Sequence, residues 1–197
     1  MTVALAEALR RLLGAFERHQ IRYMICGSAA SGLYGHVRMT GDVDIVAAVG
    51  PEDIAPLVEE LRSEFYIDAD QIRWALEQGR SFNLVHLQSS FKFDIFPLTS
   101  DRYEQVQFER RRYAESSLPG AGQIQLAFAA PEDVILSKLR WYRQGGEVSE
   151  LQWNDVLGVI AVQGDRLDLE HLHEWALYLH VADLLEQALA ERHEPRP

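Results

Sequence analysis

The alternation of apolar and polar positions predicts two halves of different kind. In the first half, short apolar runs bounded by glycine, proline and small polar residues are typical of strands, and stretches with apolar residues every three or four positions are typical of helices. The predicted strands are residues 21–26, 42–49, 81–88, 91–98 and 123–127. The predicted helices of this half are residues 3–19, 28–34, 50–65 and 70–78. Strands 81–88 and 91–98 are expected to form a hairpin.

From residue 129 onward the pattern is helical throughout. The expected helices are residues 130–144, 149–162 (capped by Ser149), 168–180 and 181–192. We therefore expect an α+β chain, with a mixed β-sheet flanked by helices over residues 1–128. A C-terminal helical lobe over residues 129–197 should pack against it.

Composition and charge restrict the expected substrates, partners and location of the protein. The 197 residues are 47% hydrophobic and 25% charged, which is ordinary for a globular protein. The net charge of −11 disfavours a polyanionic substrate and favours a small substrate or a basic protein partner. No apolar run approaches the roughly 18 residues of a membrane span, so we expect a cytoplasmic protein without a membrane partner. The single cysteine, Cys26, lies in an apolar strand and is expected to be a core residue.

Residues 101–117 are mostly polar and contain the run Arg110-Arg111-Arg112. Three interpretations stay open for this segment. It is a solvated face, a sheet edge that charge protects from pairing, or a segment that contacts substrate.

Two carboxylates begin the strand 42–49. Side chains alternate along a strand, so Asp42 and Asp44 point the same way, with Cα atoms roughly 6–7 Å apart, while Val43 and Ile45 point into the core. Carboxylates that converge repel each other unless a cation lies between them. Mg²⁺ typically takes one or two carboxylates together with substrate phosphates, so this pair is a candidate metal site.

A tight turn precedes these acids. Gly27 permits a positive φ, and Ser28 is predicted to cap a short helix whose free N–H groups suit a phosphate. Two other phosphate-binding motifs do not fit this segment. A P-loop requires Lys and Ser or Thr where Leu33 and Tyr34 stand, and the glycine spacing does not match the dinucleotide fingerprint. The histidines show no spacing typical of a zinc site.

The pattern Gly27-Ser28, then Gly35-x-x-Arg38-x-Thr40-x-Asp42-x-Asp44, resembles the nucleotidyltransferase superfamily of polymerase-β-like folds. Within it the chain is most similar to small bacterial stand-alone members, namely antibiotic nucleotidyltransferases and toxin nucleotidyltransferases of the abortive-infection type. The resemblance implies a nucleotidyltransferase fold.

The resemblance also implies further site residues. A third carboxylate on a neighbouring strand falls on Asp94, which would complete the metal site with Asp42 and Asp44. Toxin members carry a lysine and an aspartate on successive helices after the sheet. By position and order these fall on Lys138 and Asp155.

The function implied is a transfer of NMP from an NTP to an acceptor hydroxyl, with release of pyrophosphate. One or two Mg²⁺ ions, or Mn²⁺, would assist, with Gly27 and Ser28 holding phosphates. Arg38 and Thr40 either brace the turn or touch phosphate. The NTP is open, with ATP as one candidate. The acceptor is a small molecule, a protein or a tRNA.

The spacing between Ser28 and Asp42 is closer to that of antibiotic-modifying members than to that of toxins. A toxin with an antitoxin partner nevertheless remains one interpretation. Two other functions stay open. One is a non-catalytic member of this fold that binds a nucleotide or a partner, and the other is a metal-dependent phosphohydrolase.

Overall fold

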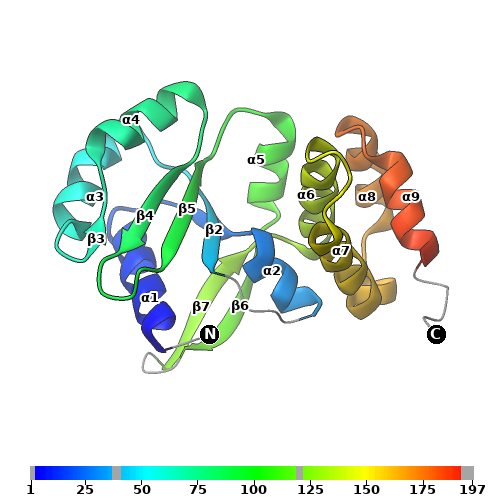
Figure 1. Ribbon diagram of the computed structural model, residues 1–197, viewed down its shortest axis with the longest axis horizontal. Helices are drawn as coiled ribbons and strands as arrows, with labels where there is room; N and C mark the ends of the chain where they lie inside the picture. Colours follow the sequence, from blue (N-terminus) through cyan, green and yellow to red (C-terminus); the bar gives the residue numbers. More distant parts are fainter. Residues whose placement is uncertain (1–2, 37–40, 119–121, 192–197) are drawn as a thin grey trace. The chain divides into compact units, whose positions relative to one another are not determined.

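The computed structural model describes residues 3–36, 41–118 and 122–191. These form two units (Figure 1). The sheet unit contains residues 3–25 together with the described residues from 41 to 128, and the helical unit contains residues 26–36 and 129–191. The short segment 26–36 groups with the later helices.

Seven strands form a single sheet in the sheet unit. They are β1 (Tyr23–Ile25), β2 (Asp42–Ala47), β3 (Phe65–Tyr66), β4 (Phe82–His86), β5 (Lys92–Pro97), β6 (Arg112–Leu118) and β7 (Gly122–Phe128). Their order is β3-β4-β5-β2-β1-β7-β6. The pairs β2–β5 and β1–β7 are parallel, whereas β1–β2, β3–β4, β4–β5 and β6–β7 are antiparallel. The predicted mixed sheet and the hairpin of β4 and β5 are therefore confirmed.

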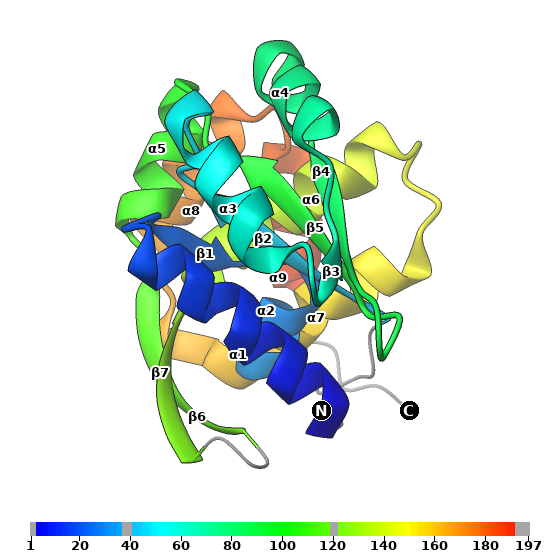
Figure 2. The same ribbon diagram turned by 90° about the vertical axis from the view of Figure 1, so that its left-hand side faces the viewer.

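The described residues of the sheet unit also form four α-helices and a 3-10 turn. They are α1 (Val3–Arg18), the 3-10 turn η1 (Pro51–Asp53), α3 (Ile54–Leu61), α4 (Ala69–Gln78) and α5 (Arg102–Glu109). Phe16 of α1 contacts Tyr23 of β1 with ring centroids 6.2 Å apart, and Tyr23 pairs with Ala47 in the sheet. Because paired residues share a face, α1 covers the face that carries Ala47, Ile45 and Val43, which are all buried. Figure 2 shows α1 and α3 in front of the strands.

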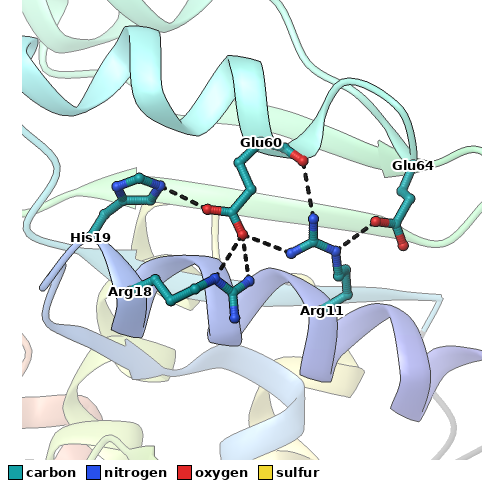
Figure 3. A network of polar contacts seen from close by, with 5 residues as sticks. All are labelled: Arg11, Arg18, His19, Glu60 and Glu64. Atoms are coloured by element: carbon teal, nitrogen blue, oxygen red, sulfur yellow. Dashed lines mark hydrogen bonds and ion pairs between the residues drawn. The ribbon is translucent and has the colours of Figure 1, made fainter.

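A group of ion pairs links α1 to α3 (Figure 3). The carboxylate of Glu60 on α3 accepts from Arg18 Nε at 2.9 Å and from Arg11 NH1 at 2.8 Å, and it lies 2.8 Å from His19 Nε2. Arg11 also donates through Nε to Glu64 at 2.6 Å. The hydrogen bonds from Arg18, Arg11 and His19 lower the pKa of Glu60 from its usual 4.5 to about 2, although partial burial opposes them.

The polar segment 101–117 contains two elements that its apolar pattern does not predict, α5 and β6. Asp101 caps α5 by accepting from Glu104 N at 3.0 Å, and Phe108 is buried. The guanidinium of Arg111 lies 4.6 Å from the Phe108 ring centroid and donates to the Phe108 carbonyl at 2.6 Å. Arg111 thus packs at the corner between the two elements, while β6 forms an edge of the sheet.

Five α-helices make up the described part of the helical unit. They are α2 (Gly27–Tyr34), α6 (Pro131–Gln144), α7 (Glu150–Gln163), α8 (Leu169–Tyr178) and α9 (Ala182–Glu191), with the 3-10 turn η2 (Gly164–Arg166) between α7 and α8. The predicted cap is confirmed, since Ser149 Oγ accepts from Gln152 N at 3.4 Å. A Cβ on Gly35 would lie 2.8 Å from the carbonyl carbon of Gly158, so glycine lets the backbones after α2 and within α7 touch. No helix in the described ranges is long and apolar enough to cross a membrane.

Candidate functional site

The sheet brings the three predicted acids onto one face. In the parallel pair β2–β5, Asp44 is the register partner of Asp94 and Asp42 is the partner of Lys92. Partners in register share a face, so the face opposite the core carries Asp42, Asp44 and Asp94, which we call the acid face. Asp94 retains 15% exposure of its side chain and Asp42 retains 45%, so the acid face is accessible to a ligand.

Lys92 places a positive charge on the acid face. Its Nζ lies 2.7 Å from Asp94 Oδ2 and 3.7 Å from Asp42 Oδ2. The hydrogen bond with Asp94 raises the pKa of Lys92 above its usual value. Partial desolvation opposes this shift, and the charges of Asp94, Asp42 and Asp44 add to it. All three acids therefore stabilise one ammonium group.

The donor chemistry of the acid face fits a divalent cation. Carboxylate oxygens are the ligands that Mg²⁺ and Mn²⁺ prefer. In the conformation described, however, no three His, Cys, Asp or Glu side chains among residues 3–36, 41–118 and 122–191 converge on one point as a metal cluster. The cation nearest to Asp94 is instead Lys92. A metal held here would take Asp42, Asp44 and Asp94 as ligands.

Two further polar residues lie beside the acids, and sequence reasoning missed one of them, Asn83. Asn83 on β4 is the register partner of Asp94, so an amide, an acid and a second acid form a row across β4, β5 and β2. Lys92 lies two residues before Asp94 and therefore shares its face. The alternation along 91–98 places Lys92 on this face, but the pairing of β4 with β5 was needed to place Asn83.

The turn after β1 begins the helical unit. Gly27 has φ of +58°, a conformation that favours glycine, as the sequence predicts. Helix α2 starts at Gly27 with Cys26 as its N-cap residue, so the prediction that Ser28 caps the helix is wrong. Ser28 lies in the first turn instead, and its carbonyl accepts from Ser31 Oγ at 3.1 Å.

Within the helical unit, Lys138 of α6 joins Ser28 to Asp155. Its Nζ lies 2.6 Å from Asp155 Oδ2 and donates to Ser28 Oγ at 3.4 Å. The side chains of Lys138 and Asp155 are only 6% and 8% exposed. Three residues that the resemblance selected are therefore in one hydrogen-bonded group. Their role in nucleotide binding stays a prediction.

The chain has only two lysines, Lys92 and Lys138, and each contacts an aspartate of the predicted site. An ammonium is a compact point charge on a flexible stem, whereas a guanidinium is a broad planar donor.

The predicted site residues Arg38 and Thr40 lie outside the described residues.

No protein-family model matches the chain, and no curated protein is significantly similar to it in sequence. Solved structures are similar in fold. An antigenic nucleotidyltransferase-like protein from Paracoccidioides brasiliensis has a TM-score of 0.51 and 18% identity, covering 95% of this chain and 89% of its own. ANT(2'')-Ia in complex with adenylyl-2''-tobramycin has a TM-score of 0.53 and 12% identity, covering 90% of this chain and 97% of its own. The chain has the nucleotidyltransferase fold, and the predicted α+β class is confirmed.

Proposed function

We propose that the protein is a divalent-metal-dependent nucleotidyltransferase, which moves an NMP from an NTP to an acceptor hydroxyl. One observation carries the proposal. Asp44 and Asp94, 50 positions apart in the chain, are direct register partners on neighbouring parallel strands, with Asp42 on the same face, in a nucleotidyltransferase fold. Solvated acids without a shared task have no reason to be concentrated on one face, because their charges repel.

Asp42, Asp44 and Asp94 would hold one or two Mg²⁺ ions, which when bound would neutralise phosphate charge and stabilise the entering and departing oxygens. Asp94 is the base that accepts the proton of the acceptor hydroxyl. The hydroxyl oxygen forms a bond to the α-phosphorus, the bond from that phosphorus to the bridging oxygen breaks, and pyrophosphate leaves with the electron pair. Asn83, in register with Asp94, orients the acceptor hydroxyl by hydrogen bonding.

Gly27, Ser28 and Lys138 bind the triphosphate in this proposal. A lysine point charge complements what the metal leaves unneutralised on a triphosphate. Asp155 holds the Lys138 ammonium in a fixed position, because their contact is 2.6 Å and both side chains are nearly buried. Arg38 and Thr40 brace the turn or contact phosphate.

The acceptor class follows from charge. A net charge of −11 disfavours a tRNA end, and a small hydroxylated molecule fits better. The solved neighbour bound to adenylyl-2''-tobramycin is consistent with such an acceptor. We propose a small polyhydroxylated acceptor and ATP as the first NTP to test. A protein hydroxyl and an antitoxin partner are outcomes that the same assay would reveal.

The test is incubation of purified protein with Mg²⁺, each α-labelled NTP and pooled acceptors, with detection of labelled product and pyrophosphate. Asp44→Asn should lower the rate about 10²–10³-fold, because it removes charge stabilisation at the reacting phosphate. Asp70→Asn is the matched control, since Asp70 pairs with Arg73 on the same helix α4, and this substitution should leave the rate unchanged. Equal rates for Asp44→Asn and wild type would refute the proposal. Release of orthophosphate in place of pyrophosphate would identify a phosphohydrolase.

A second candidate is a non-catalytic member that binds a nucleotide or a partner. The contact of Lys92 with Asp94 favours it, because this ammonium already neutralises the acid that the reaction requires as a base. Equilibrium binding of ATP without turnover, unchanged by Asp94→Ala, would support this candidate over the enzyme.

A further inference from the structure

The acid face contains a positively charged side chain of the protein itself, Lys92. Lys92 lies on β5 opposite Asp42 and two residues from Asp94, so it reaches carboxylates on two strands. Its side chain is 42% exposed. An ammonium with that exposure can leave its partners for water without disrupting the core.

We propose that Lys92 is a built-in cation of the acid face, which occupies the position of a divalent ion beside Asp94 and leaves Asp94 when that ion binds. The inference rests on the proposed function, because it assumes that the acid face is a divalent-metal site. It adds that metal binding is an exchange of one cation for another.

Charge and space both require this exchange. Asp94 Oδ2 accepts from Lys92 Nζ at 2.7 Å, so a metal on the same oxygen would lie within a few ångströms of the ammonium. Two cations at that distance repel strongly. The flexible four-carbon side chain of lysine permits the ammonium to move away from Asp94. An arginine would instead bind the carboxylate with two hydrogen bonds from its planar guanidinium.

The exchange has two consequences. Without metal, Lys92 screens the mutual repulsion of Asp42, Asp44 and Asp94. With metal, the broken ion pairs weaken the observed affinity. An exposed ion pair contributes up to about a factor of five to an equilibrium constant, so losing two pairs lowers the metal affinity by roughly 2- to 25-fold.

The first test is titration of the full chain with Mn²⁺, with free Mn²⁺ measured by electron paramagnetic resonance. Lys92→Met removes the charge and keeps the stem, and it should tighten Mn²⁺ binding by roughly 2- to 25-fold. The control is Arg73→Met. Like Lys92→Met it removes one positive charge, but the ion pair that it breaks is with Asp70 and not with Asp42, Asp44 or Asp94. Equal Mn²⁺ affinities of Lys92→Met and Arg73→Met would overturn the inference and leave the proposed metal site standing. No binding to any variant would overturn both.

The second test uses the fact that only two lysines exist. Protein labelled with ¹³C at lysine Cε should give two resonances, and their assignment follows from the one that Lys92→Met removes. Saturable addition of Mg²⁺ should shift the Lys92 resonance to that of a solvated lysine. A Lys92 resonance that does not move while Mg²⁺ binds would overturn the inference, because the ammonium would then stay at Asp94.

Discussion

The Glu60 group predicts how stability depends on acid. Glu60→Gln keeps the size of the side chain and removes the negative charge that Arg18, Arg11 and His19 share. The hydrogen bonds led by that from Arg18 lower the pKa of Glu60 in the folded chain from its usual 4.5 to about 2. A difference of that size corresponds to about 3 kcal/mol as an upper bound. Arg18 is 55% exposed, so solvent screening reduces its share, and we expect a loss of about 2 kcal/mol at pH 7.

The sign of the pH dependence follows from the lowered pKa. A carboxyl whose pKa is depressed on folding contributes its full stability above its unfolded value and loses it as pH falls through the folded value. The difference between wild type and Glu60→Gln should therefore be constant above about pH 5, shrink by about two fifths at pH 3.5, and fall to about a tenth at pH 2.

The assay is urea unfolding followed by circular dichroism at pH 7, 4.5 and 3.5. Hydrogen exchange of α1 and α3 peptides localises the effect. Glu59→Gln is the matched control on the same helix, because Glu59 is 68% exposed and pairs with Arg62 one turn away. It should change stability by less than about 0.5 kcal/mol. A Glu60→Gln protein as stable as wild type at pH 7, or a difference that does not shrink with acid, would refute the reasoning.

Two further substitutions, Gly158→Ala and Lys138→Met, test the helical unit by thermal unfolding, and Gly14→Ala on α1 of the sheet unit is the comparison for the first. A Cβ on Gly158 would lie 3.0 Å from His36 Cδ2 and 3.4 Å from its backbone N, so Gly158→Ala should destabilise by about 1–2 kcal/mol. A Cβ on Gly14 of α1 would meet the flexible end of Arg18, so Gly14→Ala should stabilise the protein by up to about 1 kcal/mol. A Gly158→Ala protein that is more stable than the Gly14→Ala protein would contradict the close approach of Gly158 to His36. Lys138→Met leaves Asp155 buried without its ammonium partner and should cost about 3 kcal/mol, with much of the loss recovered when Asp155→Leu is added. Recovery of stability without recovery of ATP binding would separate the structural role of Lys138 from its proposed role in binding.

Local patterns predicted most of the fold. Amphipathic periodicity located α1, α6, α7, α8 and α9, and strict alternation located β2, β4 and β5. The elements it missed, β3, α5 and β6, are short or polar. Their stability comes from tertiary contacts such as Phe65 against Phe93, 6.0 Å between ring centroids, which no local pattern contains.

The sequence by itself determined the spacing of Asp42 and Asp44, the shared side of Lys92 and Asp94, and the need for glycine at Gly27, because these follow from strand alternation and backbone sterics within a few residues. Only the tertiary structure decided that Asp44 pairs with Asp94 and that Lys138 meets Asp155. Register between strands far apart in the chain depends on the whole core, since a slip of one residue would turn every side chain of a strand to the opposite face.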